Sequence, residues 1–95
     1  MANQKQPKVY KLGFYRARWD KERFSEGTLE ELIESHSYTL ECGQAYEHER
    51  GNRKINTNPK TFKSLVDNLN KAINNSAANG YCEDFYFIPE EGQVA

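Results

Sequence analysis

The stretch from Asn58 to Gly80 constrains the fold more than any other part of the sequence. Asn58 suits the position just before a helix, Pro59 suits the first helical position, and Gly80 suits a helix end. Between these signals, apolar residues recur at steps of three and four, as one long amphipathic helix requires. This apolar stripe consists of Phe62, Leu65, Val66, Leu69, Ala72, Ile73 and Ala77. The asparagines outside it are expected to form an ordinary solvated surface, and they include Asn70, Asn74, Asn75 and Asn79.

The apolar face of this helix needs a partner surface, and the aromatic-rich ends of the chain are the candidates. Side chains alternate from Val9 to Trp19, which predicts a strand. Tyr10, Leu12 and Phe14 are expected on the face that meets the helix. Residues 81–88 are rich in strand formers and predict a final strand before Pro89.

The middle of the chain begins with a helix signal. Residues 20–27 are charged and predict a loop, with Phe24 packed into the core. Thr28 and Glu31 have the spacing of a capping box, in which each side chain satisfies a backbone N–H at a helix start. A short helix is therefore predicted from Leu29, ending by Ser37.

Residues 38–49 alternate again and favour a strand with one wet, acidic face. A helix is the alternative there, because Glu, Ala, Gln and Leu all tolerate one. Residues 50–52 are typical of a turn, and residues 53–57 are expected to return as a short strand with Ile55 inward.

The predicted order is strand, helix, strand, strand, helix, strand. This is the βαββαβ order of ferredoxin-like α+β folds, in which a four-stranded antiparallel sheet carries two helices on one face. Another α+β arrangement of the same elements remains the alternative, because the order of strands in the sheet cannot be derived from the pattern. Residues 8–89 are expected to form a single domain, flanked by a disordered tail at 1–7 and a frayed tail at 90–95.

Composition excludes several protein classes. Charged residues are 28% of the chain and aromatic residues 13%, too aromatic for an intrinsically disordered protein. No apolar run approaches the ~20 residues of a membrane span, and residues 1–6 lack the apolar core of a signal peptide. We therefore expect a cytoplasmic protein with no membrane partner. Cys42 and Cys82 are expected to be free thiols, with a disulfide as the less favoured alternative.

No motif indicates catalysis, a metal or a cofactor. His36, His48, Cys42 and Cys82 lack the spacing of zinc ligands. On one strand, Cys42 and His48 would lie ~20 Å apart, too far for a nucleophile and its base. The sequence therefore predicts a protein that is not an enzyme and has no cofactor.

Charge alternates in blocks along the chain. Residues 1–24 carry a net +5, 25–50 a net −6, 51–71 a net +4 and 72–95 a net −4, which together give −1. One interpretation is that neighbouring surface elements neutralise one another. The other is that one face of the fold collects charge of a single sign and attracts a partner.

The first functional hypothesis is a small non-enzymatic binding module, an accessory or inhibitor protein of the type encoded by phages and mobile elements. It would contact another protein through charged and aromatic side chains, with Tyr46 and Tyr86 also expected to be exposed. The candidate contact residues are Tyr15, Arg16, Arg18, Trp19, Glu30, Glu31, Glu34, Glu41, Glu47, Glu49, Arg50 and Arg53.

The alternative hypothesis is binding of single-stranded nucleic acid. Basic and aromatic residues are interleaved from Tyr15 to Trp19 and could stack bases and hold phosphates on the open face of the sheet. Arg50, Arg53 and Lys54 are the further candidate binding residues of this hypothesis. Against it, residues 53–57 contain no aromatic side chain and the net charge is not basic. A further hypothesis is a homodimer, formed through a sheet edge or through the open aromatic face.

Overall fold

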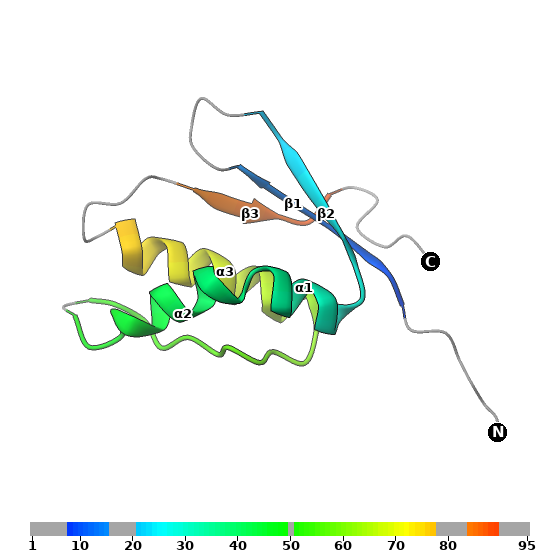
Figure 1. The fold of residues 1–95 in the computed structure, drawn as a ribbon. Coiled ribbons are helices and arrows are strands. Elements are labelled where there is room, and N and C mark those ends of the chain that lie inside the picture. The colour runs from blue at the N-terminus through cyan, green and yellow to red at the C-terminus, as the bar shows by residue number, and fades with distance from the viewer. Residues whose placement is uncertain (1–7, 16–20, 50, 78–83, 90–95) are drawn as a thin grey trace, which may run out of the picture.

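The computed structural model describes residues 8–15, 21–49, 51–77 and 84–89 of the 95-residue chain. Figure 1 shows two layers, a sheet and a group of helices that covers one of its faces. The strands are β1 (Tyr10–Tyr15), β2 (Arg23–Gly27) and β3 (Phe85–Phe87), in the antiparallel order β2-β1-β3. The helices are α1 (Leu29–Ser35), α2 (Ser37–Ala45) and α3 (Phe62–Ala77).

The described residues therefore form a small α+β structure, but the predicted ferredoxin-like order is wrong. Over the described ranges the observed order is ββαααβ, with three strands and three helices in place of four and two. The central strand β1 pairs with β2, which follows it directly, and with β3 from the other end of the chain. The predicted tails at 1–7 and 90–95 lie outside the described residues.

Helix α3 confirms the predicted amphipathic helix but begins later than expected. Asn58 and Pro59 precede the helix, and Thr61 caps it by accepting a hydrogen bond from the Ser64 N–H at 3.0 Å. The predicted end at Gly80 lies outside the described residues. The apolar stripe is buried as predicted from Phe62 to Ile73, and Ala77 is half-buried. With Leu12, Leu32, Leu40, Ile55 and Tyr86, these side chains form the core.

The first strand and the first helix agree with the sequence. Leu12 is fully buried, and Tyr10 and Phe14 pack against the core, as their alternation predicts. The Thr28 hydroxyl accepts from the Glu31 N–H, and the Glu31 carboxylate accepts from the Thr28 N–H, so the capping box is confirmed.

The predicted loop over residues 20–27 is wrong at its C-terminal part, because Arg23–Gly27 is strand β2. The residues of β2 are mostly polar or small and give little strand signal of their own, so the strand depends on its pairing with β1. In this register Phe24 projects away from the helices and is 45% exposed, which contradicts its predicted core position.

The predicted strand over residues 38–49 is also wrong, and the helical alternative is right. Helix α2 places Leu40 and Gly43, which are three residues apart, against α3. A Cβ atom at Gly43 would overlap the Cα and Cβ atoms of Ala72, so the two helices contact backbone to backbone. This close approach requires glycine at position 43.

The predicted strand over residues 53–57 and its hairpin are not formed. Gly51 does occupy a turn conformation, with φ of 75°, and Ile55 is buried as predicted. Residues 53–57 run along α3, and side chains of this helix bind backbone groups that a neighbouring strand would otherwise bind. Asn68 Oδ1 accepts from the Asn56 N–H at 2.8 Å, and Asn75 Oδ1 accepts from the Arg53 N–H at 3.1 Å.

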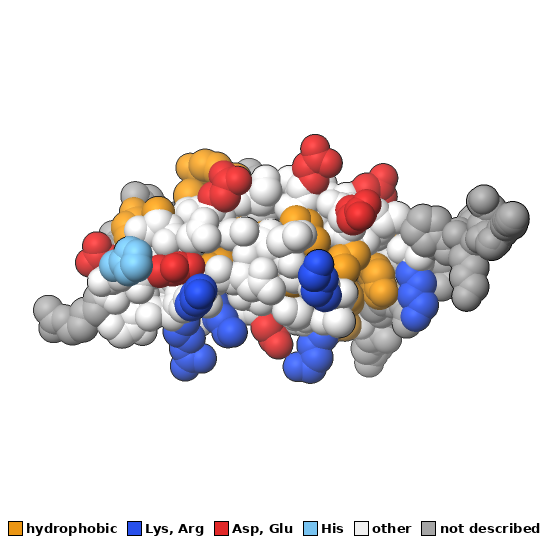
Figure 2. All heavy atoms as spheres, turned by 90° about the horizontal axis from the view of Figure 1, so that it is seen from below, with side chains coloured by type: hydrophobic (Ala, Val, Ile, Leu, Met, Phe, Trp, Pro, Cys, Tyr) orange, Lys and Arg blue, Asp and Glu red, His pale blue; other side chains and the backbone are white. Residues whose placement is uncertain are grey.

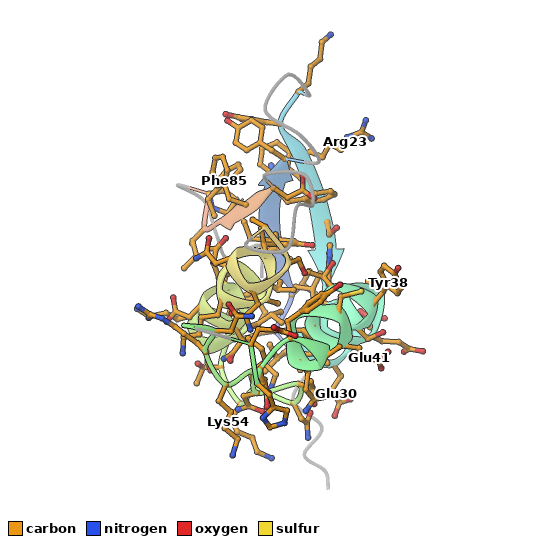
Figure 3. All side chains as sticks on the ribbon, turned by 90° about the vertical axis from the view of Figure 1, so that its left-hand side faces the viewer. Arg23, Glu30, Tyr38, Glu41, Lys54 and Phe85 are labelled. Atoms are coloured by element: carbon orange, nitrogen blue, oxygen red, sulfur yellow. The ribbon has the colours of Figure 1, made fainter. Side chains whose placement is uncertain are left out.

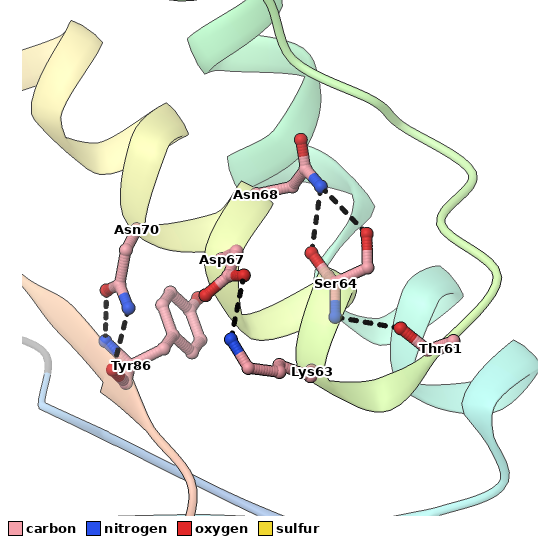
Figure 4. Close-up of polar contacts among 7 residues, drawn as sticks. All are labelled: Thr61, Lys63, Ser64, Asp67, Asn68, Asn70 and Tyr86. Carbon is pink, nitrogen blue, oxygen red and sulfur yellow. Dashed lines mark hydrogen bonds and ion pairs between the residues drawn. The ribbon is translucent and has the colours of Figure 1, made fainter.

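The expected solvated surface is therefore wrong for Asn70 and Asn75, whereas Asn74 is exposed as expected and Asn79 lies outside the described residues. Asn75 is only 2% exposed and also donates from Nδ2 to the carbonyl oxygens of Gly43 and Arg53, at 3.0 and 2.9 Å. Asn70 contacts β3 in the same way, because it donates to the Tyr86 C=O at 2.9 Å and accepts from the Tyr86 N–H at 2.7 Å (Figure 4). These amides join both neighbouring backbone segments to the helix.

Candidate functional site

The open face of the sheet, opposite the helices, carries four aromatic rings. Tyr15 comes from β1, Phe24 from β2, and Phe85 and Phe87 from β3. They share this face because antiparallel pairing places Gly13 between Phe24 and Phe87, and Tyr15 opposite Phe85. We call these four side chains the aromatic face.

The rings of the aromatic face contact one another. Tyr15 lies 4.5 Å from Phe85 and 5.7 Å from Phe87, measured between ring centroids. Phe87 lies 6.1 Å from both Phe24 and Phe85. All these distances are within the range of favourable aromatic pairs.

Gly13 in β1 makes this arrangement possible. A Cβ atom at position 13 would overlap the ring of Phe87, so the ring lies directly over the glycine. Phe87 is half-buried and contacts each of the other three rings, so it lies at the centre of the cluster. Phe24 and Phe85 are 45% and 50% exposed at its two sides. Exposed apolar groups that are contiguous and have polar residues around them are a feature of interaction sites.

Charged groups of both signs surround the aromatic face. The Lys11 ammonium lies 4.4 Å from the centroid of the Phe24 ring, a cation–π contact. Tyr15 donates a 2.9 Å hydrogen bond to the Glu22 carboxylate, which raises the pKa of Tyr15 above its usual value. Glu26 pairs across the strands with Lys11. Among the described residues, the rim therefore carries charges of both signs.

No protein-family model, curated protein or solved structure matches this chain.

The structure places only part of the predicted contact set near the aromatic face. Tyr15 belongs to it, whereas Arg16, Arg18, Trp19 and Arg50 lie outside the described residues. Arg53 lies beside α3 and not in the sheet. Its side chain is exposed, and its backbone N–H donates to Asn75. Of the two tyrosines also expected to be exposed, Tyr46 is half-buried and Tyr86 is buried, so that expectation is wrong for Tyr86.

Two of the six acidic candidates make hydrogen bonds that stabilise the fold itself. Glu31 caps α1, and the Glu47 carboxylate accepts from the Ile55 N–H at 2.8 Å, so both have structural roles. Glu49 lies in the turn after α2. The remaining three, Glu30, Glu34 and Glu41, are exposed on α1 and α2.

The helical layer nevertheless separates charge. Figure 2 looks onto this layer and shows acidic side chains mostly along one long edge and basic side chains mostly along the other. Figure 3 shows Glu30 and Glu41 on the helices, on the opposite side of the molecule from Phe85. The exposed acidic residues of α1 and α2 and the aromatic face are therefore two separate surfaces.

Sequence reasoning missed Phe24, Phe85 and Phe87 as surface residues. The alternation Phe85, Phe87 on one side and Tyr86 on the other was present in the sequence. It could not be assigned to a face without the register to β1, which places Phe14 opposite Tyr86 and Gly13 opposite Phe87.

A groove of about 270 Å³ lies between α2, α3 and the start of β3, apart from the aromatic face. It is lined by Tyr38, Thr39, Cys42, Tyr46, Ile73, Ser76 and Asp84. Cys42 is a free thiol, as expected, and Cys82 lies outside the described residues. Among the described residues, no group of three His, Cys, Asp or Glu side chains is placed to hold a metal ion, and no helix is long and apolar enough to cross a membrane.

His36 lies between the sheet and the junction of α1 and α2. Its Nδ1 is 3.1 Å from the Tyr86 hydroxyl, and its Nε2 is 3.1 Å from the Ser25 hydroxyl. The Tyr86 hydroxyl also lies 3.3 Å from that of Thr39. Burial lowers the pKa of His36 below its usual 6.5, because the charged imidazolium loses hydration.

This burial predicts a pH-dependent stability. The unfolded chain takes up a proton at His36 near the usual pKa of 6.5, whereas the folded protein resists it. The stabilisation is therefore complete above that pH and is lost as the pH falls through 6.5 towards the lower pKa of the folded state. We expect the free energy of unfolding to decrease from about pH 7.5 to about pH 5, measured by urea denaturation.

The control uses the second histidine of the chain. His36→Gln should flatten this pH dependence, whereas His48→Gln, at an exposed position, should keep it. An equal slope in both variants would show that His36 does not cause the effect.

Proposed function

We propose that this protein is a small non-enzymatic binding module that docks on a protein partner through the aromatic face. The single observation that carries the proposal is the cluster of Tyr15, Phe24, Phe85 and Phe87 on a face that none of the described helices covers. Exposed aromatic groups with a polar rim are typical of the energetically important centre of protein interfaces.

The composition of the rim favours a protein over a polyanion. Glu22 and Glu26 lie on the same face as the rings, and Lys11 already contacts Phe24. A nucleic-acid backbone would be repelled by these carboxylates, whereas a protein surface can offer charges of both signs. The partner surface we propose is apolar at its centre and carries both charges at its edge.

The test is affinity capture of the tagged protein from nuclease-treated host lysate, read by mass spectrometry. The double variant Phe24→Ser/Phe85→Ser should lose a stoichiometric partner, because each substitution removes a large exposed ring. Loss of one such ring at an interface centre typically weakens binding by about 2 kcal/mol or more.

The matched control is Tyr38→Ser, which removes a ring that is 77% exposed on α2, away from the aromatic face. It should leave capture unchanged. A second comparison replaces Glu30, Glu34 and Glu41 with glutamine. If that variant loses the partner while the double serine variant keeps it, the docking surface is the acidic helical side and the proposal for the aromatic face is wrong.

Single-stranded nucleic acid is the second candidate, and one observation favours it. The central and edge strands β1 and β3 carry aromatic rings on the open face, where the predicted third strand over residues 53–57 had none. The half-exposed rings could stack bases, and the Lys11 ammonium beside Phe24 could contact a phosphate.

Fluorescence anisotropy with labelled single-stranded oligonucleotides tests this candidate. It predicts binding that weakens steeply from about 50 mM to about 200 mM salt and that Lys11→Gln reduces. Glu26→Gln should strengthen binding, because it removes a repulsive carboxylate. Absence of binding at the lower salt concentration would remove the candidate and leave the protein partner.

A further inference from the structure

The two outer edges of the sheet differ in how their backbone groups are satisfied. At the β3 edge, the outward N–H and C=O of Tyr86 are both bound by Asn70. At the β2 edge, no described residue forms a hydrogen bond to the outward backbone groups. In Figure 3, no described strand lies beside β2 on that side. An unpaired strand edge is a template for another strand.

The pairing pattern identifies those outward groups. Since Tyr86 directs its N–H and C=O to Asn70, the opposite residue Phe14 directs its own towards β2. The residues of β2 opposite Phe14, Leu12 and Tyr10 therefore point their backbone groups to β1. The intervening residues, Phe24 and Glu26, point theirs away from the sheet. The edge ends at Thr28, whose N–H is bound by the Glu31 carboxylate.

We propose that this edge pairs with the same edge of a second copy of the chain. We place the two strands antiparallel, so that the Ser25 residues of the two copies face each other across the two-fold axis. Phe24 of each copy then lies opposite Glu26 of the other. Each such pair joins two residues with outward N–H and C=O groups, so the ladder closes with two hydrogen bonds per pair.

Charge selects this register and this partner. A shift of two residues in one direction places Glu26 of one copy opposite Glu22 of the other. The same shift in the other direction places the Glu26 residues of the two copies opposite each other. Both alternatives put like charges in direct contact, which destabilises a pair. In the proposed register, Arg23 at the start of β2 and Lys21 just before it instead run towards the exposed Glu30 at the start of α1 in the second copy.

The resulting dimer would contain one six-stranded sheet. Residues opposite each other across an antiparallel pair project on the same face, so both aromatic faces lie on one side and all helices on the other. The dimer does not depend on the partner proposed above, but it would present that partner with two aromatic faces side by side.

The test is the molar mass of the untagged protein by light scattering and sedimentation, from about 1 µM to about 1 mM. We expect a monomer that converts to a dimer within this range. Glu26→Pro removes an outward N–H without removing a bond to β1, and it should weaken dimerisation at least tenfold. Glu26→Gln loses the same charge but keeps the N–H, and it should dimerise at least as well as the original chain.

Hydrogen exchange gives a measurement that needs no substitution. Raising the protein concentration should slow exchange of the Phe24 and Glu26 amides, whereas the Ser25 amide, already bound to β1, should change much less. A protein that stays monomeric at the highest concentration would overturn the proposal. So would a dimer that Glu26→Pro leaves intact, or one in which these two amides keep their monomer rates.

Discussion

Replacing Asn75 with alanine is expected to lower the free energy of unfolding by about 3 kcal/mol or more. The side chain is 2% exposed and satisfies three backbone groups: the N–H and C=O of Arg53 and the C=O of Gly43. Alanine leaves these groups without partners in a site too closed to hydrate them fully, and each such loss costs about 1–3 kcal/mol. In a thermal melt, the midpoint should fall by roughly 15 °C.

The neighbouring residue supplies the control for this variant. Asn74 lies in the same helix but is exposed. Asn74→Ala should therefore leave stability unchanged or raise it slightly, because alanine is the better helix former. Asn75→Asp adds a nearly isosteric test, since it keeps the acceptor for the Arg53 N–H and removes both donated bonds. If Asn75→Ala melts like Asn74→Ala, the amide does not hold the segment to α3.

Replacing Gly43 with alanine is expected to destabilise the protein by about 2–3 kcal/mol. In an exposed helix, the same change would stabilise by about 1 kcal/mol, so the sign is determined by packing. Here the added methyl group would overlap both the backbone and the side chain of Ala72. Helix α2 would have to move away from α3, which would also strain the hydrogen bond from Asn75 to the Gly43 C=O.

Urea denaturation of three variants checks this expectation. Gln44→Ala, at the adjacent exposed position of α2, measures the effect of helix propensity alone. Gly43→Ala/Ala72→Gly removes one methyl group from the clash and should recover only part of the loss, because the Ala72 Cα atom also lies in the way. A Gly43→Ala protein as stable as Gln44→Ala would mean that the two helices can separate without cost.

The sequence predicted the elements whose signals are local. The stripe on α3, the Thr28 capping box and the alternation of β1 each depend on residues within a few positions of one another. The failures occurred where a distant partner determines the structure. Strand β2 is formed by pairing with β1, and α2 is distinguished from a strand by the contact of Gly43 with Ala72.

The same limit applies to the candidate site. Tyr15 could be selected from its position among basic residues, but Phe24 and Phe85 meet it only through the sheet register. Asn75 was missed for a related reason. An asparagine beside an apolar stripe resembles a solvated residue until an irregular backbone segment is placed against it.

The pairing of β1 with β3 has a consequence for the order in which the protein is made. The ribosome releases β1, β2 and all three helices before residues 85–87 emerge. Until then, the central strand has one unpaired edge, and the Asn70 amide has no Tyr86 backbone to bind. The nascent chain thus exposes two open strand edges during synthesis, and the arrival of β3 reduces them to one.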